Sequence, residues 1–230
     1  MGTWLIDDLI WIENIVGQWE PALAERVYAF VANESTGHDV YHCLRVKALA
    51  LRIAEGEGLD GDILVATSYL HDIGRGREFE GHGDHVVFGT AQAAEILPEI
   101  GFPGAKVGAV KQCIEFHEEY AWAKSKRRLP EIVRGEILGF QDADRLDAIG
   151  AVGLARMFTF GGAYRQPLWH PHVRPGHWEH GELGSSSYNH LHEKLLKLKD
   201  TMNTATGRRL AEGRHKFMEQ FAARFEREWA

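Results

Sequence analysis

The stretch ATSYLHDIGRG, residues 66–76, ends an apolar run with a histidine and an aspartate side by side, just before a turn that contains glycine. Burying an imidazole and a carboxylate without partners is costly, because both groups lose their contacts with water. A bound cation or a pair of mutually satisfied neighbours would offset that cost. The groups that decide between these two explanations have to come from elsewhere in the chain.

Helical spacing extends from this stretch in both directions. Apolar residues recur every three or four positions, whereas clear two-residue alternation is scarce, and this pattern predicts helices. The predicted helices cover residues 21–32, 40–54, 62–71, 85–97, 104–119, 131–158, 188–202 and 208–228. Glycine and proline mark the breaks between them, as in the glycine-rich stretch 74–84. The sequence therefore predicts an all-α fold.

Length and composition indicate one domain. The chain has 230 residues, of which 44% are hydrophobic and 26% charged, so it is long enough to form a single hydrophobic core. The long irregular segment over 160–187 is typical of a functional cover or a mobile strap. It carries Tyr164, Trp169 and Trp178, and we interpret it as a lid or specificity element, with a strap packed by its tryptophans as the alternative.

Charge and cysteine content exclude several classes of partner. The formal net charge is −7 and the pI is about 6.0, which argues against a nucleic-acid polymer or an anionic membrane as partner. Cys43 and Cys113 lie in apolar helical patterns without CxxC spacing, which suits a reducing compartment. The N-terminus is acidic and no apolar run approaches the length of a membrane span. We expect a cytoplasmic protein, and the sequence does not indicate its oligomeric state.

Two groups of polar residues interrupt the predicted helices. His42 begins an apolar face that continues through Val46, so its ring should point inward, as a satisfied core histidine or as a ligand. Consecutive helical residues diverge by about 100°, so His71 and Asp72 can share one ion only if other helices supply further ligands.

The acidic group lies in the predicted helix over 131–158. Asp142, Asp144 and Asp147 interrupt its buried side, and three neighbouring carboxylates repel one another unless a cation or arginine offsets them. A salt-bridge network with Arg145 and Arg156 is the structural alternative to a metal ion.

These residues, in this order, resemble a known signature. His42, the His-Asp pair at 71–72 and the aspartate of ADRL at 144 look like the ligand set of the HD-domain metal-dependent phosphohydrolase superfamily. The segments GHDVYHCLRV, SYLHDIG, QDADRLDAIGAVGLAR, FTFGGAYRQPLWHP and NHLHEKLLKLKDTMNTATGRRLA resemble a bacterial single-domain subgroup from about residue 35 onward. Members of that subgroup act as nucleotide pyrophosphohydrolases or phosphohydrolases. A second His-Asp pair, His38-Asp39, occurs by coincidence or for another purpose.

The resemblance implies a metal site on an all-α bundle. It places His42, His71, Asp72 and Asp144 on the metal-binding positions, with Asp142 as a supporting or alternative ligand. Two imidazoles and two carboxylates form a site of intermediate hardness, which favours Mn²⁺ or Fe²⁺, with Mg²⁺, Co²⁺ and Zn²⁺ as further candidates.

Two additional histidines are candidate ligands of a second ion. His85 begins one apolar helical run and His117 ends another, and other branches of the superfamily use histidines at comparable places for a second metal ion. In that case Asp72 would bridge the two ions. Substrate contact and helix capping are the alternatives. We expect Arg75 or Arg77, on the turn after the His-Asp pair, to contact phosphate, although arginines on turns are usually only solvated.

The resemblance implies hydrolysis of a phosphate ester or anhydride, most naturally in a nucleotide, by a water that a divalent metal has activated. A diiron oxygenase acting on a small organic substrate is the alternative, and a binding protein with a vestigial site is a third reading. We expect one HD-type domain over 1–230. Its parts are N-terminal helices over 1–34, a metal-site core over 35–158, an irregular lid-like segment over 159–187 and C-terminal helices over 188–230.

Overall fold

The computed structural model describes residues 15–120, 127–176 and 184–229, and within these ranges every regular element is helical. The all-α prediction is confirmed for this part of the chain. The helices are α1 (Glu20–Val31), α2 (Val40–Glu57), α3 (Gly61–Leu70), α4 (Arg75–Phe79), α5 (His85–Glu99), α6 (Gly104–Phe116), α7 (Arg134–Asp147), α8 (Gly150–Ala163), α9 (Ser187–Glu193), the 3₁₀ segment η2 (Leu195–Thr201) and α10 (Ala205–Trp229).

Aspartate caps fix where three of these helices begin. The Asp39 side chain accepts a hydrogen bond from the backbone N–H of His42, Asp60 caps α3 in the same way, and Asp84 caps α5. Each cap satisfies N–H groups that have no partner inside the helix and contributes about 1 kcal/mol. The caps at Asp39 and Asp84 matter most for function, because they fix the helix starts next to His42 and His85.

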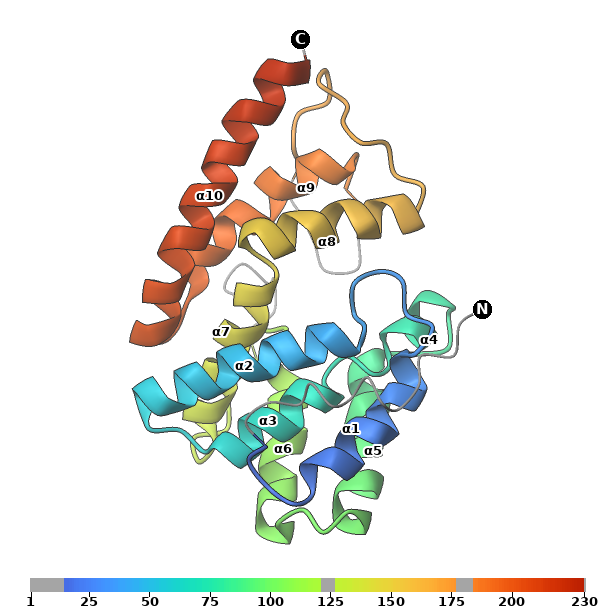
Figure 1. Cartoon of the computed structure of the whole chain (residues 1–230), viewed down its shortest axis with the longest axis vertical. Helices are drawn as coiled ribbons and strands as arrows, with labels where there is room; N and C mark the ends of the chain where they lie inside the picture. Colours follow the sequence, from blue (N-terminus) through green and yellow to red (C-terminus); the bar gives the residue numbers. More distant parts are fainter. Residues whose placement is uncertain (1–14, 121–126, 177–183, 230) are drawn as a thin grey trace.

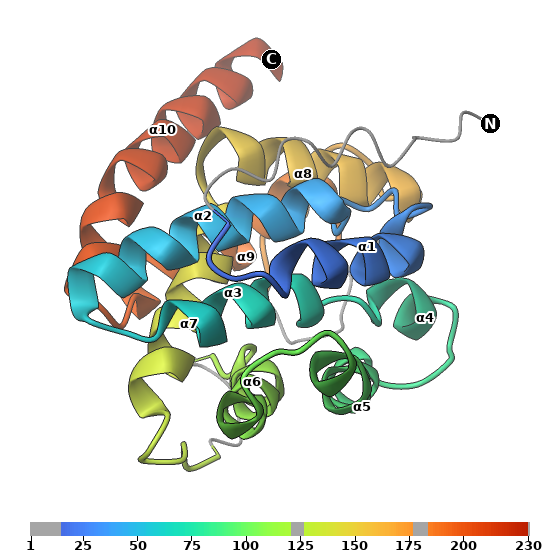
Figure 2. The ribbon, with the colours of Figure 1, turned by 60° about the horizontal axis from the view of Figure 1, so that its bottom comes forward.

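Two hydrophobic clusters form the core. The first joins α1, α3, α5 and α6 around residues such as Leu23 and Tyr69, and the second joins α2, α7, α8, α9 and α10 around residues such as Phe140 and Tyr188. Figure 1 shows α1 to α6 in the lower part and α8 to α10 in the upper part, with α7 running between them. Figure 2 shows α1, α2 and α3 side by side. The centre of the molecule is therefore the place where α2, α3 and α7 meet.

The structure differs from the predicted helix over 131–158. The helix stops at Asp147, and α8 begins at Gly150, whose φ is 81°. A side chain at this residue would be strained, and its Cβ would lie 3.0 Å from Cγ of Arg214. Hydrophobic periodicity continues across this break, so the pattern alone could not find it. The break lets α8 leave the direction of α7 and pack against α9 and α10.

Three further regions differ from expectation. The predicted helix over 188–202 is divided into α9 and the 3₁₀ segment η2. A short helix, α4, forms inside the glycine-rich stretch 74–84, and α8 continues to Ala163, so the irregular segment begins at Tyr164. Trp178 lies outside the described residues. Cys43 and Cys113 are buried free thiols, as their apolar surroundings in the sequence suggest.

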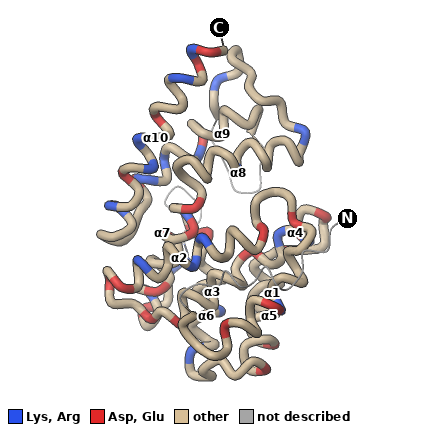
Figure 3. The backbone as a smooth tube through the Cα atoms, viewed as in Figure 1, with Lys and Arg blue, Asp and Glu red and all other residues tan. Residues whose placement is uncertain are grey.

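Charges of both signs are interspersed along α10 and around the lower helices (Figure 3). Among the described helices, none combines the length and the hydrophobicity that crossing a bilayer requires.

Candidate metal centre

Four side chains from three parts of the chain converge at the centre of the bundle. His42 comes from α2, His71 and Asp72 directly follow α3, and Asp144 comes from α7. The Nε2 atoms of His42 and His71 are 3.1 Å apart, and Oδ2 of Asp72 lies 3.5 Å and 3.3 Å from them. Oδ1 of Asp144 lies 3.9 Å from Nε2 of His42 and 3.7 Å from Nε2 of His71. The structure thus brings together the four residues that the resemblance implies.

A second group of potential ligands lies on the other side of Asp72. The Nε2 atoms of His85 and His117 are each 3.7 Å from Oδ1 of Asp72. Both nitrogen atoms are buried and have no hydrogen-bond partner among the described residues. Glu118 lies 3.5 Å from Nε2 of His85, and Glu78 lies 3.0 Å from its Nδ1. Asp72 therefore offers one oxygen atom to each group.

Hydrogen bonds on the far side of each ring fix how three of the histidines face the centre. Nδ1 of His42 is 2.8 Å from Oδ2 of Asp147, and Nδ1 of His71 is 3.2 Å from the carbonyl oxygen of Ser68. Nδ1 of His117 is 2.7 Å from a carbonyl oxygen one turn earlier in the chain. Because these partners accept a hydrogen bond, Nδ1 carries a proton and Nε2 faces inward, where its lone pair can bind a metal ion when the ring is neutral. Metal-binding histidines are usually oriented in this way.

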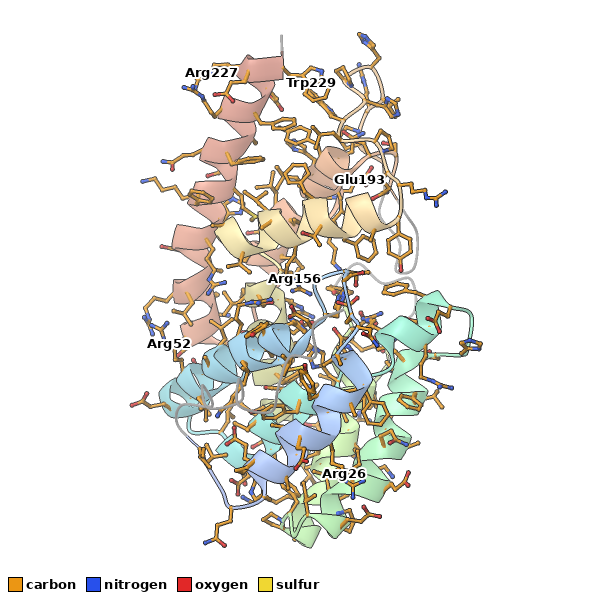
Figure 4. The ribbon with its side chains drawn as sticks, turned by 45° about the vertical axis from the view of Figure 1, so that its right-hand side comes forward. Arg26, Arg52, Arg156, Glu193, Arg227 and Trp229 are labelled. Carbon is orange, nitrogen blue, oxygen red and sulfur yellow. The ribbon has the colours of Figure 1, made fainter. Side chains whose placement is uncertain are left out.

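Asp147 anchors His42 and is itself held by two arginines. Its carboxylate accepts hydrogen bonds from Nε of Arg45 at 2.7 Å and from Nη1 of Arg156 at 2.8 Å. Burial opposes ionisation, but the hydrogen bonds from His42 and Arg45 outweigh it and hold the pKa of Asp147 below its usual range. Figure 4 shows Arg156 between α8 and α2. The ion pair between Arg156 and Asp147 therefore connects α8 to the carboxylate that orients His42.

Asp142 has a different role from its neighbours in the acidic group. Its carboxylate accepts hydrogen bonds from the backbone N–H groups of Asn203 and Thr204, both at 2.8 Å, and from the Thr204 hydroxyl at 2.7 Å. Burial raises the pKa of Asp142, although these donors oppose the shift. Asp142 therefore fixes the chain just before α10, while Asp144 faces the centre.

Of the two arginines expected to contact phosphate, Arg75 lies in the centre. Its Nε donates a hydrogen bond to Oδ1 of Asp72 at 2.9 Å, and its guanidinium also pairs with Glu78 and Glu118. Burial opposes ionisation of Asp72, but the charges of Arg75 and His71 hold its pKa well below the usual range. Arg75 thus fixes the carboxylate that the two groups of ligands share.

Arg77 points elsewhere, and aromatic side chains flank the centre. The guanidinium of Arg77 lies 4.6 Å from the ring centre of Phe88, on an exposed part of α4. The rings of Phe79 and Tyr164 are 5.2 Å apart, and those of Phe160 and Tyr164 are 4.6 Å apart. Tyr164 therefore joins the start of the irregular segment to α4.

The rest of the irregular segment behaves as a strap where it is described. The ring of Trp169 lies 4.8 Å from that of Tyr188 and 5.3 Å from that of Trp229, in the second hydrophobic cluster. The described part of the segment thus packs as the strap alternative predicted, and its role as a lid or specificity element stays a prediction.

The electrostatics of the centre favour a cation. Burial opposes a charge on His71, but the carboxylates of Asp72 and Asp144 outweigh it and raise its pKa to about 10. Two imidazole nitrogens, unpartnered nitrogens on a second pair of histidines, and ionised carboxylates form a donor set that suits a divalent ion without a thiolate. The described residues thus fit one divalent ion beside His42, His71 and Asp144, and a second beside Asp72, His85 and His117.

An all-α bundle with a His, His-Asp, Asp centre defines the class of protein. The HD domain model matches residues 39–149. The relatives described below extend the likeness over most of the chain, and the chain belongs to the HD-domain superfamily of metal-dependent phosphohydrolases.

Three relatives illustrate the likeness. YpgQ of Bacillus subtilis (strain 168) is 35% identical over 204 residues, which cover 88% of this chain and 89% of YpgQ. The structure of YpgQ in complex with ADP has a TM-score of 0.63 at 32% identity and covers 89% of this chain and 97% of that one. An HD-superfamily hydrolase of Bacillus thuringiensis has a TM-score of 0.66 at 32% identity, covering 90% and 95%. A structure from Lactobacillus plantarum has a TM-score of 0.75 at 28% identity, covering 94% and 98%.

Sequence reasoning missed several residues of the centre. The role of Asp147 in orienting His42, the carboxylates of Glu78 and Glu118, and the location of His38 all depend on contacts between distant helices. Lys194, at the end of α9, was also missed, and burial lowers its pKa to about 8. For Asp147 a signal existed, because its spacing from Asp144 places both residues on neighbouring parts of one helix face.

Proposed function

We propose that this phosphohydrolase acts on a nucleotide and cleaves a phosphate ester or anhydride bond, as an NTP or dNTP pyrophosphohydrolase or a nucleotidase does. The observation that carries the nucleotide is the likeness to YpgQ, which has been solved in complex with ADP. The aromatic rings of Phe79, Phe160 and Tyr164 next to the centre support it, because aromatic side chains stack well on nucleobases.

In this proposal His42, His71, Asp72 and Asp144 hold one divalent ion, and Asp72, His85 and His117 hold a second. Mn²⁺ or Fe²⁺ suits these ligands best. Such an ion supplies an acidic bound water and polarises the phosphoryl oxygen. Asp147 keeps His42 turned inward through the hydrogen bond to Nδ1.

We assign phosphate contact to Arg75 rather than Arg77, because Arg75 lies in the centre, whereas Arg77 lies over Phe88. For this contact, one of the acidic partners of Arg75 would have to turn from the guanidinium to a bound cation. We also propose a cytoplasmic location, which two buried and unpaired cysteines support.

Metal analysis and a substrate panel test this proposal together. The protein is purified without chelator, its metal content is measured, and phosphate and pyrophosphate release is followed over nucleotides and phosphomonoesters with added Mn²⁺. Release of pyrophosphate or phosphate from a nucleotide is the expected result. Turnover of phosphomonoesters that lack a base, with none for nucleotides, would contradict it.

The shared carboxylate of Asp72 also favours a second candidate function. If Asp72 helped to hold two iron ions, the site would resemble that of a diiron oxygenase, which would act on a small organic substrate. Oxygen consumption by the iron-loaded protein, without phosphate release, would replace the hydrolase proposal with this one.

A further inference from the structure

The second His-Asp pair of the sequence lies beside the centre rather than apart from it. Asp39 caps α2, and His38 is placed so that its ring is 5.6 Å from the ring of His42. Nε2 of His38 lies 3.9 Å from Oδ2 of Asp72, the oxygen atom that also faces His42 and His71. His38 is thus a further histidine at the edge of the proposed metal site.

A chain of hydrogen bonds on the other side of the ring fixes the position of His38. The carboxylate of Glu34 accepts from the backbone N–H groups of Thr36 at 2.7 Å and of His38 at 2.6 Å. The Thr36 hydroxyl oxygen is 2.5 Å from Oε1 of Glu34 and 2.9 Å from Nδ1 of His38. These three residues form a closed turn directly before α2.

The number of protons in this turn sets the tautomer of His38. A carboxylate can only accept, so the single proton of the Thr36 hydroxyl points to Glu34. The hydroxyl oxygen must then accept a hydrogen bond from His38, and Nδ1 must carry the proton. The Nε2 atom of the neutral ring is therefore left with its lone pair exposed to Asp72.

In the ring that carries its proton on Nδ1, Nε2 is an acceptor. Nε2 of His38 and Oδ2 of Asp72 are then two acceptors that face each other at 3.9 Å, too far for a direct hydrogen bond. A water molecule that donates to both would satisfy this arrangement.

We propose that Nε2 of His38 accepts a hydrogen bond from the attacking water and holds one lone pair of that water toward phosphorus. This role rests on the proposed hydrolytic function, in which the attacking water would be activated beside Asp72. In this role His38 only accepts a hydrogen bond and does not take up a proton. Thr36 and Glu34 are positioning residues, because they act only by fixing the tautomer and the direction of the His38 ring.

The tautomer can be tested without substrate or metal. In metal-free protein labelled with ¹⁵N-histidine, long-range ¹H–¹⁵N correlation spectra distinguish a protonated nitrogen from a bare one, and His38→Asn assigns the signals by removing them. We expect His38 to have a protonated Nδ1 and a bare Nε2. Thr36→Ser should keep this tautomer, because it keeps the hydroxyl, and Thr36→Val should lose it. A protonated Nε2 in the native protein would overturn the inference.

The role in turnover is tested with the same variants, using ATP and Mn²⁺. The Asn side chain keeps the contact with Thr36 but does not reach the place of Nε2, whereas the Gln side chain does. We expect His38→Asn to lower kcat about 10²-fold with little change in KM, and His38→Gln to recover part of the loss. Metal content should equal that of the native protein in both variants.

Other results would give His38 a different role. Loss of bound metal in His38→Asn would make it a ligand, and a raised KM at unchanged kcat would make it a substrate-binding residue. Either result overturns the inference. If the native protein turned over no nucleotide, the proposed function would fail, while the tautomer measurement would still decide whether the turn holds His38 as described.

Discussion

Asp72 uses its two oxygen atoms for different neighbours. Oδ1 accepts from Arg75 and faces His85 and His117, while Oδ2 faces the histidines of the first group. The sequence shows that a His-Asp pair ends an apolar run. It does not show which oxygen serves which partner, because that depends on how three helices meet.

A matched pair of substitutions separates the roles of two neighbouring aspartates. Asp147→Asn weakens the hold on Nδ1 of His42, so we expect the affinity for Mn²⁺ to fall about 10- to 100-fold. Asp142→Asn leaves that affinity unchanged and lowers stability instead, because Asp142 binds the backbone before α10. Calorimetric titration with Mn²⁺ and thermal melts measure the two effects. Equal affinity in both variants would show that Asp147 does not orient His42.

A histidine substitution tests the second ion. If Asp72, His85 and His117 hold one of two ions, His117→Ala lowers the metal content from two ions per chain to one, while His71→Ala and Asp72→Ala abolish activity. His82→Ala is the control, because His82 is exposed. Elemental analysis after purification without chelator gives the count. An unchanged count in His117→Ala would argue for a site with a single ion.

At the scale of elements, the sequence predicted most helices to within a few residues but not the break between α7 and α8. Apolar spacing is a local signal, and it predicted the starts of α2, α3 and α5, where the structure also has aspartate caps. The turn at Gly150 has no such signal, because apolar residues continue on both sides of it. Helix α4 was missed because the glycines around it suggest a loop. Its contacts with α5 and with Glu118 are not visible in the sequence.

The backbone at Gly150 gives a prediction about stability. Its φ is 81°, so Gly150→Ala forces alanine into a left-handed conformation against Arg214, and we expect the free energy of unfolding to fall by about 1–3 kcal/mol. Gly108 is the matched control, because it lies inside α6 and a Cβ there meets open space. Gly108→Ala should raise stability by about 0.5–1 kcal/mol. Urea titrations compare the two, and equal effects would mean that the turn tolerates a side chain.

At the scale of the whole molecule, the centre joins the two hydrophobic clusters, so its charge state should affect global stability. In the metal-free protein the pKa of His71 rises from about 6.5 to about 10. A raised folded-state pKa means that the folded state binds the extra proton, so this stabilisation is full below pH 6.5 and is lost as the pH rises toward 10.

Thermal melts over this range test the consequence. We expect the Tm of chelator-treated protein to fall between about pH 6.5 and 8, below the range in which Lys194 loses its proton, and His71→Gln to flatten the dependence. A divalent ion at 100 times its Kd should raise the free energy of unfolding by about 2.7 kcal/mol, because it binds only the folded state. The Tm should rise accordingly. A flat Tm in the chelated native protein would show that His71 is neutral throughout.

Opposite sides of α7 serve the C-terminal part of the chain and the metal centre, and this affects what a C-terminal truncation should do. Asp142 accepts hydrogen bonds from the chain just before α10, and Asp144, two residues further along the same helix, faces the centre. Shortening the protein from its carboxyl end should therefore weaken metal uptake although it removes no ligand, because α10 packs in the second hydrophobic cluster and Asp142 holds the residues before it. A purification tag is best placed at the far end of α10, away from these contacts.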